Sequence, residues 1–258
     1  MEEFYLVKIS TLQYKVIFII SGILSLLLIA FILSQVKGGF LFPPLNEVFG
    51  RFFSLFIDIK YLEKFFMSIL RLLICLIISF LIALFLSYLR HIKKEISDFF
   101  TPFLVFLKCS PLAIISIYLF LVVGANQGPY YIILSLILPL MIEAFFTAQD
   151  EIPLGIIQEL RITDVSSFYK YFKVILPLIF PYIAMSFIMS FGLGLKVAVM
   201  SEYLMQTPSS LGVYIYDLRT NLDIVTILAT LLFCIAFTLI IELIAKFTFD
   251  RLNRRILK

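Results

Sequence analysis

Long stretches of almost uncharged, apolar sequence limit this chain to a membrane fold. Residues 16–35, VIFIISGILSLLLIAFILSQ, contain no charged side chain. At about 1.5 Å of rise per residue, a helix of this length covers the roughly 30 Å core of a bilayer. Similar runs recur along the chain, which is 62% hydrophobic and only 15% charged, whereas a soluble domain is nearer half apolar. The chain is therefore expected to be an all-α polytopic membrane protein that folds as one helical bundle.

Six membrane-spanning helices are predicted. Pro111 is expected to kink the third span, which should end at the sequence GANQGP, and Pro139 lies inside the fourth. The six spans cover residues 16–35, 68–89, 99–123, 130–146, 177–203 and 224–246. We interpret residues 1–62 as an N-terminal helix with an outer loop, and residues 63–258 as a core domain with a cytoplasmic loop at 147–176.

Lys and Arg residues are distributed unevenly among the predicted loops. Most of the 21 basic residues fall in the N-terminal tail, in residues 90–98, in residues 147–173 and at the C-terminal end. Because short loops rich in Lys and Arg remain in the cytoplasm, both termini and the 147–173 segment are predicted to be cytoplasmic. His91, the only histidine, lies in the basic sequence RHIKKE and is expected to be solvated.

The polar segment between the fourth and fifth spans predicts two short helices joined by a turn. DEIPLGIIQELRI has Pro153 near a helix start with acidic residues ahead of it, an arrangement that favours a helix N-terminus. TDVSS then offers Asp164, Ser166 or Ser167 as the N-cap of a second helix. SSFYKYFKVIL leads into the fifth span at Pro177. From the pattern alone, the segment is either a docking element for a partner or an ordinary surface loop.

The spacing of this segment resembles the coupling loop of permease subunits in binding-protein-dependent ABC importers. That loop carries Glu-Ala-Ala, a Gly four residues after the last Ala, and Leu-Pro twelve residues further on. Ser commonly follows two residues after the Gly. With Leu-Pro aligned, the matching positions here are Gln158, Glu159, Leu160, Asp164, Ser166, Leu176 and Pro177. The frame is kept, although Gln and Asp replace the signature Glu and Gly. The resemblance implies that these residues contact a separate ATPase.

Other stretches resemble the nitrate/sulfonate/taurine branch of these permeases in their order and spacing. They are FPPLNEVF, SILRLLICLIISFLIALFLSYL, LKCSPLAIISIYLFLVVGANQG and FGLGLKVAVMSEYL followed by LGVYIYDLRTNLD. The last keeps a Lys and a Glu of that branch but lacks its Trp. The resemblance covers about residues 43–258 and draws attention to Ser68, Arg71, Lys196 and Glu202.

These four residues are candidates for the translocation pathway or its gate. A charge at the centre of a membrane helix costs ~2.5–3.5 kcal/mol on insertion scales. Lys196 therefore either lines the pathway, where it would attract an anionic solute, or snorkels to the outer interface. Glu202 lies at the outer end of the fifth span, where it contacts a binding protein, shapes the gate or is merely solvated. Arg71 is expected to snorkel.

The sequence shows no catalytic chemistry. It contains no Gly-x-x-x-x-Gly-Lys-Ser/Thr loop of the kind that holds nucleotide phosphates, and no nucleophile–base pair or metal-ligand cluster of recognisable spacing. Cys75, Cys109 and Cys234 lie singly in apolar segments and are expected to be buried small hydrophobic residues. The chain is therefore expected not to be an enzyme and to need neither a cofactor nor a metal. In an ABC importer, ATP hydrolysis would come from a separate subunit.

The resemblance also implies partners and a location. A solute-binding protein would deliver a small solute to the outer side, two permease copies would form a homodimer, and two ATP-binding subunits would drive transport. The branch implies a solute such as a sulfonate, taurine or nitrate, and the cytoplasmic (inner) membrane of a bacterium. Two other classes remain open. One is an ATP-independent secondary transporter, expected to show inverted repeats, and the other is a membrane scaffold subunit that transports nothing.

Overall fold

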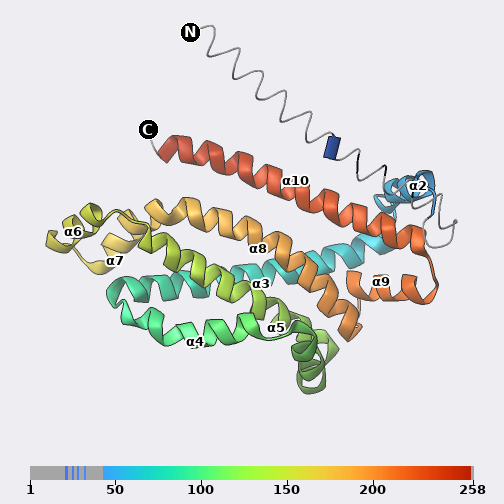
Figure 1. The fold of residues 1–258 in the computed structure, drawn as a ribbon, viewed down its shortest axis with the longest axis horizontal. Coiled ribbons are helices and arrows are strands. Elements are labelled where there is room, and N and C mark those ends of the chain that lie inside the picture. The colour runs from blue at the N-terminus through green and yellow to red at the C-terminus, as the bar shows by residue number, and fades with distance from the viewer. Residues whose placement is uncertain (1–20, 23–24, 26–27, 29–31, 33–42, 257–258) are drawn as a thin grey trace, which may run out of the picture. The chain divides into compact units, whose positions relative to one another are not determined.

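The computed structural model describes residues 21–22, 25, 28, 32 and 43–256, with side chains described as far as residue 248. The first expected span, residues 16–35, lies largely outside this set. From residue 43 onward, each regular element is a helix (Figure 1). The elements are α2 (Leu45–Leu55), α3 (Ile59–Ile92), α4 (Glu95–Cys109), α5 (Leu112–Asp150), α6 (Leu154–Ile162), α7 (Ser167–Lys170), the π-helical turn η1 (Tyr171–Ile175), α8 (Leu176–Met205), α9 (Leu211–Thr220) and α10 (Ile224–Ile256).

The chain divides into two compact units. They are Met1–Ile57 with Leu218–Leu232, and Asp58–Asp217 with Phe233–Lys258. In the first unit, Nε of Arg51 in α2 donates to Oγ1 of Thr226 at 3.1 Å. The carboxylate of Asp223 caps the start of α10 by accepting from the backbone N–H of Thr226 at 3.0 Å. The candidate site lies entirely within the second unit.

The core of the second unit is formed by α3, α5 and α8, which pack against one another (Figure 1). Gly194 of α8 sits where the three helices meet. A Cβ at this position would lie 2.6 Å from Cδ1 of Leu72 and 2.7 Å from Cδ1 of Ile137. Small residues allow membrane helices to approach this closely. The start of α3 is held to α10 by aromatic rings, with Phe65 and Phe237 centroids 4.9 Å apart.

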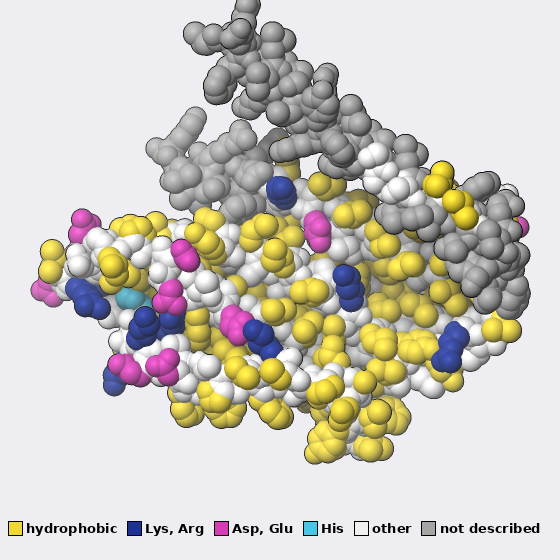
Figure 2. Space-filling model, viewed as in Figure 1, with side chains coloured by type: hydrophobic (Ala, Val, Ile, Leu, Met, Phe, Trp, Pro, Cys, Tyr) yellow, Lys and Arg dark blue, Asp and Glu magenta, His cyan; other side chains and the backbone are white. Residues whose placement is uncertain are grey.

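Four helical stretches in the described part of the chain are long and apolar enough to cross a membrane. They are Ile59–Ile92, Leu112–Asp150, Ser167–Met205 and Ile224–Thr248. Large apolar side chains are exposed along them, as the broad hydrophobic surface in Figure 2 shows. Exposed apolar surface of this extent belongs in lipid or in an interface. The structure therefore confirms the expected class, an all-helical multi-pass membrane protein, while the total of six spans stays a prediction.

The region of the third and fourth expected spans differs from the prediction at two places. Pro111 does not kink a continuous helix: α4 ends at Cys109 and Pro111 precedes α5, because proline disfavours helical backbone at the residue before it. The end expected for the third span at GANQGP agrees with a break at Gly124, whose φ is 80°, but the expected loop is wrong, since helix resumes directly after this residue. An ion pair ties α4 to α5, with Nζ of Lys108 2.7 Å from Oε2 of Glu143.

The fifth expected span begins earlier than its proline. Helical structure runs from Ser167 through the π-helical turn Tyr171–Ile175 into α8. Pro177 has no N–H to donate to the carbonyl of Lys173, and a proline inside a helix crowds that same carbonyl. A local π-helical turn is one way for a helix to accommodate such a break. The second half of the polar segment is thus continuous with a membrane helix.

Candidate functional site

The segment between α5 and α8 has the two short helices and the turn that the sequence predicts. Pro153 precedes α6 in extended backbone, and Thr163 to Ser166 connect α6 to α7. Oγ of Ser166 accepts from the backbone N–H of Tyr169 at 3.3 Å, so Ser166, one of the three expected caps, is the N-cap of α7. We call residues 151–176 the connecting segment.

The backbone at Asp164 explains how the turn between α6 and α7 does without a glycine. In the described part of the chain, left-handed φ angles occur only at Gly124, Gln206, Ser209 and Leu222. Asp164 is not among them, so the turn between α6 and α7 does not demand a residue without a Cβ. Gln158, Glu159, Asp164 and Ser166 are exposed, while Leu160 and Leu176 are half-buried and Pro177 is exposed at the start of α8.

Helix α6 presents two different faces. Ile157 and Leu160 are half-buried and line a cavity beneath the helix. Leu154 and Ile162 lie on the other face, and the side chain of Ile162 is 85% exposed. Phe168 of α7 is also exposed. A polar segment that keeps apolar side chains in solvent is typical of a surface that a partner covers.

Polar contacts join the ends of α3 and α5 and fasten Tyr171 of the connecting segment to α3. Nη2 of Arg90 donates to both carboxylate oxygens of Asp150, at 2.9 and 2.8 Å. Nε2 of Gln149 donates to Oγ of Ser87 at 2.6 Å. The hydroxyl of Tyr171, a buried residue of η1, donates to the same Oγ at 2.8 Å. In the Arg90–Asp150 pair a single guanidinium nitrogen serves both carboxylate oxygens, and the contact is charge-assisted.

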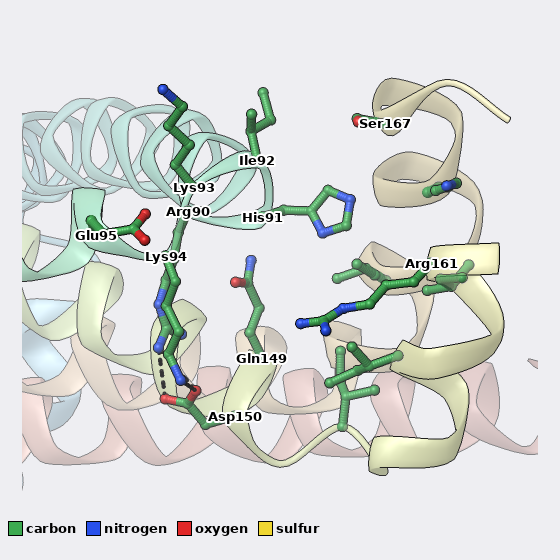
Figure 3. A pocket seen from close by; sticks show the side chains of 15 residues that line it. Arg90, His91, Ile92, Lys93, Lys94, Glu95, Gln149, Asp150, Arg161 and Ser167 are labelled. Carbon is green, nitrogen blue, oxygen red and sulfur yellow. Dashed lines mark hydrogen bonds and ion pairs between the residues drawn. The ribbon is translucent and has the colours of Figure 1, made fainter. Parts of the chain in front are cut away.

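The cavity beneath α6 has a volume of about 860 Å³. Its walls come from the end of α3, the start of α4, the end of α5 and the connecting segment (Figure 3). Most of its charged side chains are basic: Arg90, Lys93, Lys94, Arg161 and Lys170, against Glu95 and Asp150. His91 also lines it and is half-buried rather than fully solvated as expected.

Three of the four candidate pathway residues meet at the other end of the same helices. The Glu202 side chain is completely buried and forms an ion pair with Nη1 of Arg71. Oγ of Ser68 donates to Oε2 of Glu202 at 2.6 Å. The backbone N–H of Gly212 donates to the same carboxylate oxygen at 3.3 Å, and that of Leu211 donates to Oγ of Ser68 at 2.9 Å. The cluster therefore joins α3, α8 and the start of α9.

This cluster corrects two expectations. Arg71 does not snorkel to an interface, because its side chain is only 7% exposed and its guanidinium faces Glu202. Glu202 is not a solvated helix end. A glycine is needed beside it, since a Cβ on Gly212 would collide with the Tyr203 backbone nitrogen and with Cβ of Glu202. The buried charges are stable there because each is paired and hydrogen-bonded.

Lys196 lies apart from this cluster. It is an exposed residue within the long span Ser167–Met205, and in the described part of the chain its amino group makes no ion pair. The neighbouring turns of α8 expose Tyr182, Met185, Met189 and Met200. Lys196 therefore stands on an outward face of α8 that is otherwise apolar.

Several residues of the site were not expected from the sequence. Arg90, Gln149 and Asp150 have no motif around them, and their partners are separated by about sixty positions along the chain. The only local signal is a charged or amide residue at the end of an apolar span. Cys109 also differs from expectation, because it is exposed, while Cys75 is buried and Cys234 is half-buried.

The fold and the site define a multi-pass helical membrane protein with a structured polar segment between two long helices. Its sequence matches the family described as binding-protein-dependent transport system inner membrane component over residues 76–258. The match covers more than half of the chain, and the chain therefore belongs to this family. It confirms the resemblance to ABC importer permeases, while the nitrate/sulfonate/taurine branch stays a prediction. A comparison with curated proteins finds no relative that matches.

Proposed function

We propose that this chain is the transmembrane permease subunit of an ATP-driven importer for a small anionic solute. Its family supports a transport role in general. The observation that carries the ATP-driven part is the connecting segment, which combines exposed apolar side chains with firm attachment to the helical core. The partner that would bind the exposed surface of the connecting segment is a separate ATP-binding subunit.

The docking face consists of Leu154, Ile162 and Phe168, all exposed and all on α6 or α7. Apolar anchors surrounded by polar residues are the usual centre of a protein interface. Gln158 and Glu159 are exposed beside them and would form its polar rim. Ser166 caps α7 at the turn that contains Asp164, and this turn would fix the angle at which the apolar side chains are presented.

Movement of the docking face would be passed to the bundle as a rigid-body motion. Helix α7 continues through η1 into α8, so displacement of the connecting segment displaces a membrane helix directly. The other end of the segment follows the last turn of α5, which the Arg90–Asp150 ion pair and the Gln149–Ser87 hydrogen bond hold against α3. Such packed, bistable elements transmit small shifts over long distances.

Lys196 supports a water-lined pathway on the exposed face of α8. An unpaired lysine facing lipid at mid-span would cost ~2.5–3.5 kcal/mol, and this cost is removed if the face borders water or a partner copy. We propose that two copies of the chain meet there and that Lys196 attracts an anion such as a sulfonate, taurine or nitrate. Ser68, Arg71 and Glu202 would hold the α8–α9 connection at the end of this pathway.

The remaining partners follow from the same proposal. A solute-binding protein would dock on the side of the Glu202 cluster, and two ATP-binding subunits would occupy the opposite side, in the cytoplasm. The chain would then lie in the cytoplasmic (inner) membrane of a bacterium, with both termini in the cytoplasm. Energy for transport would come from the ATP-binding subunits, and this chain would need no cofactor.

Site-specific cross-linking tests the docking face. The variant Ile162→Cys places a thiol at the most exposed apolar position of α6, and the wild-type chain with its exposed Cys109 is the matched control. Treatment of native membranes with a short bis-maleimide should link the variant, but not the wild type, to a protein with its own phosphate-binding loop. The proposed role would be contradicted if Ile162→Cys is linked only to proteins without a phosphate-binding loop, or if no linkage is specific to position 162.

A further inference from the structure

The cavity beneath α6 collects basic side chains from segments that are distant in sequence. Arg90 and Lys93 come from the α3–α4 turn region, Arg161 from α6 and Lys170 from α7. Figure 2 shows Lys and Arg side chains, together with carboxylates, around the single histidine at this end of the second unit. Basic loops are ordinary at one end of a membrane bundle, but a shared cavity of about 860 Å³ is not required by that rule.

The charges around the cavity are only partly neutralised within the protein. Asp150 accepts from Arg90 and lies 3.7 Å from Nζ of Lys94. Lys93, Arg161 and Lys170 form no ion pair with any part of the chain that the structure describes. Nε of Arg90 is buried beside the cavity and has no hydrogen-bond acceptor in the described part. Cationic donors thus outnumber the acceptors available to them.

Arg161 directs its guanidinium into the cavity, and Lys170 of α7 lines the same cavity. In Figure 3, the guanidinium of Arg161 extends from α6 toward Gln149 and the Arg90–Asp150 pair, whereas Lys93 turns away from them. The His91 ring is half-buried at the same wall. The set contains a planar guanidinium and an ammonium group, which together suit an oxyanion that accepts several hydrogen bonds.

We propose that this cavity binds a phosphate-bearing anion, either the headgroup of an anionic lipid or a free phosphate, chiefly through Arg161 and Lys170. The site lies beside Ile92, where the long apolar helix α3 ends, and with this end of α3 in the headgroup region the cavity would face lipid phosphates. Basic pockets between membrane helices are suited to such headgroups. Glu95 lies at the margin of the cavity (Figure 3).

A bound anion would brace the connecting segment against the α3–α4 turn. Arg161 and Lys170 lie on α6 and α7, while the opposite wall is formed by α3 and α4. One anion between them would add to the hydrogen bond from Tyr171 to Ser87, which holds η1 against α3. This inference concerns the chain alone and does not depend on the proposed ATP-binding partner.

The test uses the full-length chain in nanodiscs and two separate probes. In one arm, phosphatidylcholine discs are compared with discs that also contain phosphatidylglycerol, in phosphate-free buffer. In the other, inorganic phosphate is added to phosphatidylcholine discs, with NaCl at equal ionic strength as the reference. The readouts are the thermal unfolding midpoint and amide hydrogen exchange in α6. Arg161→Gln and Lys170→Gln are compared with Lys173→Gln, which removes the same charge from an exposed position outside the cavity.

We expect an anion to raise the midpoint and slow exchange in α6 for the wild type and for Lys173→Gln. Arg161→Gln and Lys170→Gln should each require about tenfold more of the anion, which corresponds to the loss of one charge-assisted hydrogen bond. A response in the lipid arm alone identifies a headgroup, and a response in the phosphate arm alone identifies a free phosphate. The proposal is overturned if neither probe acts, or if Lys173→Gln weakens the response as much as the two cavity variants do.

Discussion

Arg71 and Glu202 show how a buried charge is tolerated at the level of single residues. The carboxylate of Glu202 is fully buried, yet it is paired with Arg71 and accepts hydrogen bonds from Ser68 and Gly212. Removing one member of such a pair leaves the other charge uncompensated, whereas removing both does not. The cluster is therefore a cooperative unit, and its members are not separable contributions.

A double-mutant cycle checks this view. Arg71→Met or Glu202→Met alone should destabilise the protein by about 3–5 kcal/mol, and the two substitutions combined should cost clearly less than the sum. The stability of each variant is measured by thermal unfolding in detergent. Strictly additive losses would show that the two charges do not stabilise each other. Lys64 forms an ion pair with Asp217, and both side chains are more exposed than those of Arg71 and Glu202. Lys64→Met should therefore cost less than either cluster variant.

Contacts between individual side chains are the part of the structure that the sequence predicts least. The family resemblance identified Ser68, and the resemblance together with the cost of charge in apolar spans identified Arg71 and Glu202. The sequence did not show that Arg71 and Glu202 form a pair, because they are 131 positions apart and only tertiary packing brings them together. From its local sequence, Arg71 was expected to snorkel to an interface, whereas in the structure it pairs with the buried Glu202.

At the scale of elements, the connecting segment behaves as one piece with the helices that carry it. Its first end follows α5 directly, and Asp150, the last residue of α5, is held by Arg90. Its second end continues through η1 into α8. Loosening of the first end should therefore free α6 without unfolding the bundle, since the main packing of α3, α5 and α8 lies elsewhere.

The variant Asp150→Asn tests this attachment. Because half of the Asp150 side chain is exposed, the pair with Arg90 is expected to contribute roughly 1 kcal/mol, which corresponds to about fivefold faster amide exchange in α6. Glu151→Gln, one residue later and exposed, is the matched control and should leave the exchange unchanged. Equal exchange rates in Asp150→Asn and the wild type would mean that the ion pair does not hold the segment.

Local signals in the sequence predicted some elements well and others poorly. Pro153, the TDVSS turn and the capping serine predicted α6 and α7, because caps and turns depend on a few neighbouring residues. The helix that resumes directly after Gly124 and the continuous helix through Tyr171–Ile175 were not predicted. Proline marks a position where the ideal helix fails, but the surrounding packing determines whether the chain breaks, as at Pro111, or adjusts, as before Pro177.

At the scale of the whole molecule, the two ends of the helices in the second unit differ in their side chains and, in the proposed function, in their tasks. One end carries a buried charge cluster at the α8–α9 connection, and the other carries exposed apolar side chains above a basic cavity. The helices between them are apolar, and Lys196 is the exposed charge on the span Ser167–Met205 between Lys173 and Glu202. This division suits a subunit that receives solute at one end and a mechanical input at the other. Membership of a transport family supports that assignment.

The most direct test of the central claim is to purify the tagged chain from its native membrane in mild detergent and identify what accompanies it by mass spectrometry. We predict a stoichiometric ATPase with its own phosphate-binding loop. It should be lost with Ile162→Asp, which places a charge in the docking face, and retained with Thr163→Asp, which adds the same charge at the next, polar position. Purification of the chain alone, capture of an unrelated enzyme, or retention of the ATPase by Ile162→Asp would contradict the account.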